Sequence, residues 1–120
     1  MLTDKKILLV DDSAFMRKVL RDILESAGYK NFIEAGNGTE AIEKYRSEKP
    51  DFIFLDVIMP DVNGMDVLRM IGREAKIIIV SAVGQKEMIE QAKSLGALDY
   101  IVKPFDREQV LEKTTKYFAN

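Results

Sequence analysis

Short apolar segments alternate along the chain with longer segments in which apolar residues recur every three or four positions. Three of the short segments, residues 7–10, 52–55 and 77–80, are apolar at every position. Such segments are typical of central strands in a parallel sheet, because helices bury both faces of those strands. Two shorter or more mixed segments, residues 31–35 and 100–102, suit strands near the edges of the same sheet. The pattern therefore predicts five parallel strands.

The segments between the predicted strands have the apolar spacing of amphipathic helices. The first helix is expected to begin at Asp12 or Ser13, either of which can cap it, and to end at Gly28. Its expected buried stripe comprises Phe15, Val19, Leu20, Ile23, Leu24 and Ala27. Four further helices are indicated by apolar positions at 41–45, 65–71, 88–95 and 110–114.

Five helices that alternate with five strands indicate an α/β fold, in which a five-stranded parallel sheet is doubly wound as (β/α)5. The chain has 120 residues, which is a common size for one compact domain. No linker, repeat or low-complexity segment interrupts the pattern. One domain is therefore expected to span residues 1–120.

The composition excludes several classes of function. The chain has no cysteine and no histidine, so disulfides, thiolate or imidazole metal sites and histidine-based catalysis are ruled out. Its 47% hydrophobic and 32% charged residues are typical of a globular protein, and no apolar run is long enough to cross a bilayer. A net charge of −2 without a basic block favours no nucleic-acid partner. We expect a cytoplasmic protein without membrane insertion.

Polar residues that can carry chemistry follow the predicted strands at the same end. Ligands of open parallel sheets bind beyond the carboxyl ends of the strands. Each residue also has an ordinary structural explanation: a helix cap, a turn carboxylate, a strand-end hydroxyl or a solvated amine. Together, however, three carboxylates, a hydroxyl and an amine at one rim indicate a functional site. The residues are Asp11, Asp12, Asp56, Ser81 and Lys103.

Three carboxylates in one crevice require a cation. Two carboxylates about 4 Å apart repel by roughly 4 kcal/mol at an effective dielectric constant of about 20. Oxygen ligation by so few protein groups suits Mg²⁺, or Mn²⁺ in its place. A carboxylate beside such an ion can attack a phosphoryl group and form an acyl phosphate. The ion and Lys103 would then neutralise the phosphoryl oxygens, while Ser81 donates to another oxygen.

Four segments resemble a known family across essentially the whole chain. They are LLVDDSAFMRKVLRDIL, FIFLDVIMPDVNGMDVL, IIIVSAVGQ and LDYIVKPF. In combination they resemble the receiver domains of two-component response regulators, and within them the chemotaxis regulators that signal to flagellar motors. The resemblance implies the flavodoxin-like strand order 2-1-3-4-5. It also implies Asp56 as the phosphoacceptor, Asp11 and Asp12 as the acid pair, and the backbone carbonyl of Ile58 as a further metal ligand.

The resemblance implies a switch as well. Ser81 and Tyr100 hold the positions of a hydroxyl and an aromatic side chain that respond to phosphorylation and change the face formed by helix 4, strand 5 and helix 5. The bond between Lys103 and Pro104 is expected to be cis. Ser81 stands where many relatives have threonine, while Ile58 and Val83 occupy positions that are often polar.

The implied partners are a sensor histidine kinase, a motility or chemotaxis output protein and a phosphatase. The protein is then a monomer and a switch rather than an enzyme, with self-phosphorylation and autodephosphorylation as its only reactions. A receiver that is a fragment of a larger response regulator would have the same chemistry.

Two other functions remain open on the residues alone. A magnesium-dependent aspartyl phosphatase of the haloacid-dehalogenase type also uses an aspartate after a parallel strand. Its motif is Asp-x-Asp, however, whereas Asp11 and Asp12 are adjacent, and no cap domain is apparent. A flavodoxin-like electron carrier would need donors for the FMN phosphate in its first loop, where these two carboxylates would repel it.

Overall fold

The computed structural model describes residues 4–118, in which strands and helices alternate from end to end. The strands are β1 (Lys6–Val10), β2 (Asn31–Ala35), β3 (Phe52–Leu55), β4 (Ile77–Ser81) and β5 (Asp99–Val102). The helices are α1 (Ala14–Ser26), α2 (Gly38–Glu48), α3 (Gly64–Ile71), α4 (Lys86–Ser94) and α5 (Arg107–Phe118). Each predicted strand and helix is therefore confirmed, with ends that differ by one or a few residues.

All neighbouring strands are parallel and lie in the order β2-β1-β3-β4-β5, so the predicted fold class and strand order are confirmed. The more mixed strands, β2 and β5, are the edges of the sheet, as expected. The pairing aligns the carboxyl ends of the strands, with Val10 opposite Leu55 and Ser81 opposite Val102. Residues that follow these strands consequently meet at one rim of the sheet.

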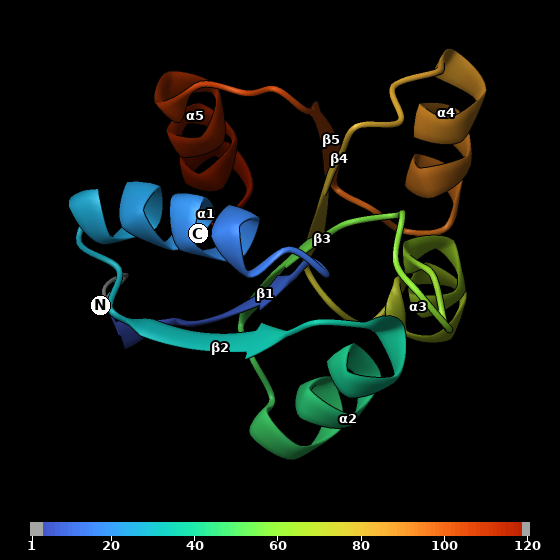
Figure 1. The fold of residues 1–120 in the computed structure, drawn as a ribbon, viewed down its shortest axis with the longest axis horizontal. Coiled ribbons are helices and arrows are strands. Elements are labelled where there is room, and N and C mark those ends of the chain that lie inside the picture. Colours follow the sequence, from blue (N-terminus) through green and yellow to red (C-terminus); the bar gives the residue numbers. More distant parts are fainter. Residues whose placement is uncertain (1–3, 119–120) are drawn as a thin grey trace.

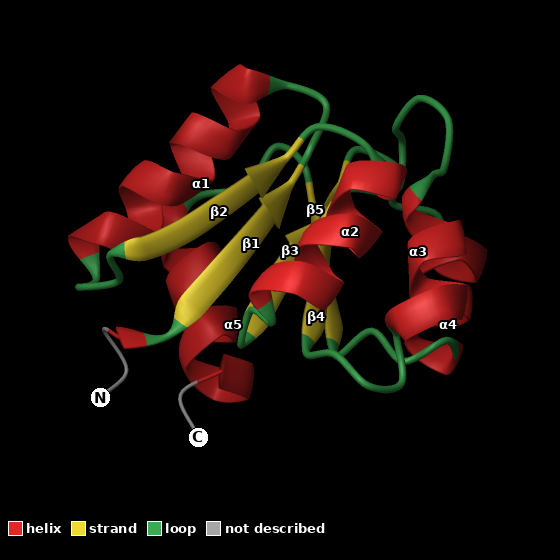
Figure 2. Ribbon diagram, turned by 90° about the horizontal axis from the view of Figure 1, so that it is seen from below, coloured by secondary structure: helices red, strands yellow, loops and turns green. Residues whose placement is uncertain are grey.

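Helices cover both faces of the sheet (Figures 1 and 2). Alternate strand residues supply two separate apolar clusters: Ile7 and Leu9 belong to the cluster under α1 and α5, and Leu8 and Val10 to the cluster under α2, α3 and α4. On the first face, the ring of Phe118 stacks on a strand phenylalanine with 4.2 Å between ring centroids. Burial on both faces explains why the central strands are continuously apolar.

Side chains cap most of the helix starts. The Ser13 hydroxyl accepts the Met16 N–H at 3.2 Å, which identifies Ser13 rather than Asp12 as the cap of α1. Asparagine side chains cap α2 and α3 in the same way. The cap position of α4 is Gln85, which makes no side-chain capping hydrogen bond. The amino end of α4 therefore lacks the contact that stabilises the start of α1, α2 and α3.

The expected buried stripe of α1 is wrong at both of its ends. Leu20 and Leu24 are buried, but Phe15 is 71% exposed. At about 100° per residue, a position five residues before Leu20 lies about 140° away from it around the helix axis. Phe15 therefore points away from the sheet. Ala27 forms the exposed C-cap of the helix, and Gly28 follows with a φ of 101°, as its predicted role at the helix end requires.

Within residues 4–118, no helix has the length and the apolar composition that crossing a membrane requires.

Candidate functional site

Three carboxylates gather at the carboxyl ends of the central strands. Asp11 and Asp12 follow β1, Asp56 follows β3, and one oxygen from each lies within 4.8 Å of the other two. Asp11 and Asp56 are buried, with 2% and 5% exposure, whereas Asp12 is exposed. The predicted convergence of these residues is confirmed. A cluster that is open to solvent on one side fits a hydrated divalent cation held by a few carboxylates.

Lys103 bridges the two buried carboxylates. Its Nζ lies 2.7 Å from Asp11 Oδ2 and 3.1 Å from Asp56 Oδ2. Burial lowers the pKa of this ammonium group, but the hydrogen bonds with both carboxylates outweigh burial and hold the pKa above its usual value. Lys103 therefore carries a positive charge at neutral pH. One ammonium against three carboxylates leaves an excess of negative charge in the cluster.

Backbone N–H groups hold the other oxygens of the buried carboxylates. Asp11 Oδ1 accepts the Ser13 N–H at 2.9 Å, and Asp56 Oδ1 accepts the Ile58 N–H at 3.1 Å. Each carboxylate oxygen of Asp11 and Asp56 therefore accepts a hydrogen bond, which fixes the two side chains. Within residues 4–118, no hydrogen bond of this kind holds the Asp12 carboxylate.

A glycine shapes the loop that contains Asp56 and Ile58. The Gly64 N–H donates to the Val57 carbonyl at 2.9 Å, so the loop between β3 and α3 folds back on itself. A Cβ at Gly64 would overlap the Asp56 carbonyl oxygen. Only glycine allows this close approach of the start of α3 to the residue that carries the carboxylate.

Ser81 and Tyr100 contact the same residue of the loop between β4 and α4. The buried Ser81 hydroxyl accepts the Val83 N–H at 3.3 Å, and the Tyr100 hydroxyl donates to the Val83 carbonyl. Burial raises the pKa of Tyr100, and the negative charge of Asp56 raises it further. The hydrogen bond with Ser81 lowers the pKa by less, so it lies above its usual value. The phenol therefore remains a hydrogen-bond donor at neutral pH.

The remaining predicted residues lie around the same rim. The Lys103–Pro104 bond is cis, as the resemblance implies, and the Lys103 N–H donates to the Ser81 carbonyl at 2.9 Å. The side chain of Ile58 is 57% exposed, and that of Val83 is partly buried. The Ile58 N–H donates to the Asp56 carboxylate, and the Ile58 carbonyl as a metal ligand stays a prediction.

Sequence reasoning missed two contributors to the site. Arg17 donates from Nη1 to the Asp11 carbonyl at 2.5 Å. In the sequence, this contact is indicated only by a positively charged residue near the start of the helix that follows Asp11 and Asp12. The Val83 carbonyl is the acceptor for Tyr100, and no side-chain pattern indicates a backbone acceptor.

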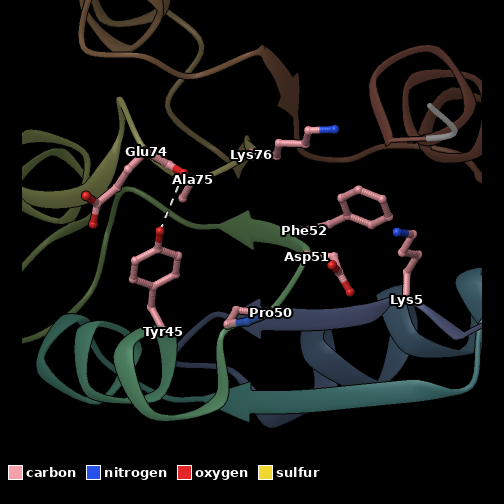
Figure 3. A pocket seen from close by; sticks show the side chains of 8 residues that line it. All are labelled: Lys5, Tyr45, Pro50, Asp51, Phe52, Glu74, Ala75 and Lys76. Carbon is pink, nitrogen blue, oxygen red and sulfur yellow. Dashed lines mark hydrogen bonds between the residues drawn. The ribbon is translucent and has the colours of Figure 1, made fainter.

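A pocket of about 270 Å³ lies at the other end of the strands, where Figure 3 shows Lys5, Phe52 and Lys76 among its lining residues. These residues precede or begin β1, β3 and β4, whereas the carboxylates follow the strands. The Tyr45 hydroxyl points across this pocket toward the Glu74 carbonyl at 3.5 Å. The length of the sheet therefore separates this pocket from the acidic rim.

Comparisons with known proteins agree with this geometry. Residues 7–115 match the family described as the response regulator receiver domain. The chain is 48% identical over 115 residues to the chemotaxis protein CheY of Thermotoga maritima, covering 93% of this chain and 96% of that protein.

Two solved structures share the fold. One is the CheX–CheY–BeF3–Mg+2 complex from Borrelia burgdorferi, with a TM-score of 0.91 and 33% identity over 97% of this chain and 90% of that chain. The other is the response regulator domain of Thermotoga maritima CheB, with a TM-score of 0.87 and 34% identity over 97% of each chain. Receiver domains bind Mg²⁺ at an acidic pocket, and Asp11, Asp12 and Asp56 form an acidic cluster here. The family match spans most of the chain, and the protein accordingly belongs to the response regulator receiver family, as a CheY-like receiver domain.

Proposed function

We propose that this protein is a phosphorylation-activated switch of two-component signalling in chemotaxis or motility, and that Asp56 accepts the phosphoryl group. The observation that carries this proposal is the environment of the Asp56 carboxylate. It is buried at the end of a central strand, held by the Ile58 N–H and Lys103, and it shares a cluster with two further carboxylates. Such a carboxylate is held in place for nucleophilic attack.

Asp11, Asp12, Asp56 and the Ile58 carbonyl are the proposed ligands of Mg²⁺, or of Mn²⁺ in its place. The excess of negative charge around Lys103 and the oxygen-only donor set favour a hard divalent ion with retained waters. When bound, the ion supplies charge neutralisation at the phosphoryl oxygens.

In the proposed reaction, an Asp56 oxygen attacks the phosphorus of a phosphohistidine on a sensor histidine kinase. A P–O bond forms, the P–N bond breaks, and the departing imidazole keeps the electron pair and takes up a proton. Lys103 stabilises the negative charge on the phosphoryl oxygens, and the Ser81 hydroxyl donates to one of them. The protein then catalyses nothing beyond its own phosphorylation and dephosphorylation.

The proposed signal passes from Ser81 to Tyr100 through Val83, the residue that both side chains contact. A Ser81 hydroxyl that turns toward the phosphoryl group releases the Val83 N–H and changes the loop that Tyr100 holds. The output surface is the face formed by α4, β5 and α5. The exposed side chain of Val102, on the edge strand β5, offers a partner an apolar contact on this face.

The proposed partners are a sensor histidine kinase, a chemotaxis or motility output protein and a phosphatase. The similarity to a CheY that was solved in complex with CheX, BeF3 and Mg+2 supports a protein partner. We propose that the protein acts as a monomer in the cytoplasm, without nucleic acid.

Incubation with acetyl phosphate and Mg²⁺, followed by intact-mass measurement, tests this function. The parent protein should gain one acid-labile phosphoryl group, and chelation of the metal should prevent the gain. Asp56→Asn keeps the size of the side chain and should gain none. Undiminished labelling of Asp56→Asn, with the label on another residue, would refute the assignment of Asp56.

A further inference from the structure

We propose that Arg17 is a positioning residue of the metal site, and that it acts by fixing the peptide that joins Asp11 to Asp12. The inference rests on the proposed function, because it assumes that these carboxylates bind the cation. Arg17 lies in the first turns of α1 and is not itself a candidate ligand.

Arg17 makes two hydrogen bonds in different directions. Its Nη1 donates to the Asp11 carbonyl at 2.5 Å, and its Nε donates to Glu34 Oε1 at 2.8 Å. The Arg17 side chain is only 17% exposed. The guanidinium is therefore held between the end of β1 and the edge strand β2.

This contact completes the set of bonds that hold Asp11. Its N–H donates to the Ala35 carbonyl at 3.2 Å, and its carboxylate oxygens accept from Ser13 and Lys103. The remaining polar group of Asp11 is its backbone carbonyl, which accepts the hydrogen bond from Arg17. Asp11 consequently has a partner at every polar group.

The effect of Arg17 extends to Asp12 through the planar peptide bond. The Asp11 carbonyl and the Asp12 N–H belong to one rigid plane, so an anchored carbonyl sets the direction in which the Asp12 Cα leaves β1. No side-chain hydrogen bond holds Asp12 within residues 4–118. The Arg17 contact therefore orients the backbone from which the exposed carboxylate of the acid pair projects.

The planar guanidinium suits this role better than an ammonium group. The guanidinium donates to the carbonyl from Nη1 and to the carboxylate from Nε, two atoms held in a fixed plane, whereas an ammonium group donates from one atom only. Glu34 also offsets the charge of Arg17, which limits repulsion between the guanidinium and a bound cation. Outer partners that orient metal ligands typically change metal affinity by about 10- to 100-fold when they are removed.

Arg21 provides a matched control. It lies one helical turn after Arg17 and contacts the same Glu34 carboxylate, at 3.3 Å from Oε2. It is also within 3.9 Å of Glu25, but no contact joins it to Asp11. Arg21→Gln thus removes a neighbouring cation and a Glu34 contact while it leaves the Asp11 carbonyl bonded.

The test is calorimetric titration of Mg²⁺ into the metal-free proteins, with no phosphodonor. Arg17→Gln should raise the dissociation constant for Mg²⁺ about tenfold, and Arg17→Lys should raise it by less. Arg21→Gln should bind Mg²⁺ with a dissociation constant within about twofold of that of the parent. In the metal-free state, the NMR shift of the Asp12 amide should change in both Arg17 variants and stay constant in Arg21→Gln. Arg17→Lys keeps the positive charge, and its Mg²⁺ affinity tests the inference if Arg17→Gln does not fold.

Equal Mg²⁺ affinity in the parent and the Arg17 variants would overturn the inference, as would equal losses in Arg17→Gln and Arg21→Gln. A parent protein that does not bind Mg²⁺ would overturn the proposed metal site itself. Because that result is seen in the parent alone, it is distinguishable from failure of the Arg17 inference.

Discussion

The two flanks of the acidic rim are held in different ways. On one flank, α1 begins at a serine cap, and Arg17 ties the helix to the Asp11 carbonyl. On the other flank, α4 begins at Gln85 without a side-chain cap, and Ala92 is its one buried residue. The helix beside the acid pair is thus anchored at the rim, whereas the amino end of α4 is not.

The other end of α4 has the contacts that its start lacks. Gly96 follows the helix with a φ of 114°, and a Cβ there would overlap the Gly72 carbonyl at the end of α3. Arg73 donates to the Ser94 carbonyl at 3.4 Å, and Lys93 lies 3.7 Å from the buried Asp99 carboxylate. The helix is therefore attached at its carboxyl end, while its amino end follows the loop that Ser81 and Tyr100 contact.

The proposed function gives the two flanks different roles. A metal and phosphoryl site needs positioned carboxylates, and on the α1 flank hydrogen bonds hold both carboxylate oxygens of Asp11. A switch needs a segment whose local opening costs little free energy, and the missing side-chain cap at the start of α4, where Lys86 and Glu87 are exposed, favours this segment for the proposed role. The proposed function uses both flanks.

The largest expected effect is on the anchored flank. Saturating Mg²⁺ should raise the free energy of unfolding by about 1–3 kcal/mol, because it relieves repulsion among Asp11, Asp12 and Asp56 and binds only the folded site. Asp12→Ala should stabilise the metal-free protein and lose the response to Mg²⁺. Thermal melting curves with and without the metal measure both. Asp22→Ala removes an exposed carboxylate of α1 and is the control; a parent whose melting is unaffected by Mg²⁺ would contradict the metal site.

The second effect concerns the lifetime of the phosphoryl group. Ile58 and Val83, which the resemblance places beside the path of the hydrolytic water, cannot orient that water. Replacing them together by Ile58→Asn and Val83→Glu should shorten the lifetime about tenfold, equivalent to about 1.4 kcal/mol at the barrier. The loss of acid-labile phosphate over time, in the parent and the double variant, measures this lifetime. A double variant that loses phosphate no faster than the parent would refute the prediction.

Removal of the cap residues tests the comparison of the flanks directly. Ser13→Ala should lower the free energy of unfolding by about 1 kcal/mol, because the Met16 N–H loses its acceptor. Gln85→Ala should change it by much less, since no capping bond is lost. Urea unfolding of the two variants measures the difference. Equal losses in both would mean that α4 is capped in solution and that the contrast between the flanks is wrong.

The smallest effect is a pH dependence at the attached end of α4. Burial alone raises the pKa of Asp99, but the hydrogen bonds from Lys113 and the Tyr100 N–H outweigh it and hold the pKa below its usual value. A carboxylate with a lowered folded-state pKa stabilises the protein above its ordinary pKa of about 3.9, and this stabilisation is lost as the pH falls through the folded value.

Asp99→Asn should therefore be less stable than the parent at neutral pH, by less than about 1 kcal/mol for partly exposed partners. The difference should shrink as the pH falls below about 4. Urea unfolding of the parent and Asp99→Asn at neutral pH and below about pH 4 measures this difference in stability. A difference that is the same at both would show that Asp99 contributes through its shape rather than its charge.

The sequence predicted what depends on local pattern and on general sheet geometry. Continuously apolar segments identified the central strands because both of their faces are covered, and the shared rim placed Asp11, Asp12 and Asp56 together. The exposure of Phe15 was not predicted, because a list of apolar positions does not by itself fix the angle at which each meets the sheet.

Contacts made by backbone groups could not be predicted from the sequence for a different reason. The Val83 carbonyl and the Asp11 carbonyl have no signature in side-chain pattern, so the partners of Tyr100 and Arg17 became evident only in the folded chain. The close approach of Gly64 to the Asp56 carbonyl is of the same kind.

Amide hydrogen exchange with and without acetyl phosphate and Mg²⁺ tests the central claim most directly, that phosphorylation of Asp56 changes the α4 flank and leaves the α1 flank in place. In the parent, exchange should change in residues 82–90 and stay constant in residues 14–26. Asp56→Asn should show no change at residues 82–90, and Ser81→Ala, which is still phosphorylated, should show a smaller change there than the parent. A phosphorylated parent with unaltered exchange at residues 82–90, or equal changes in Asp56→Asn, would contradict the account.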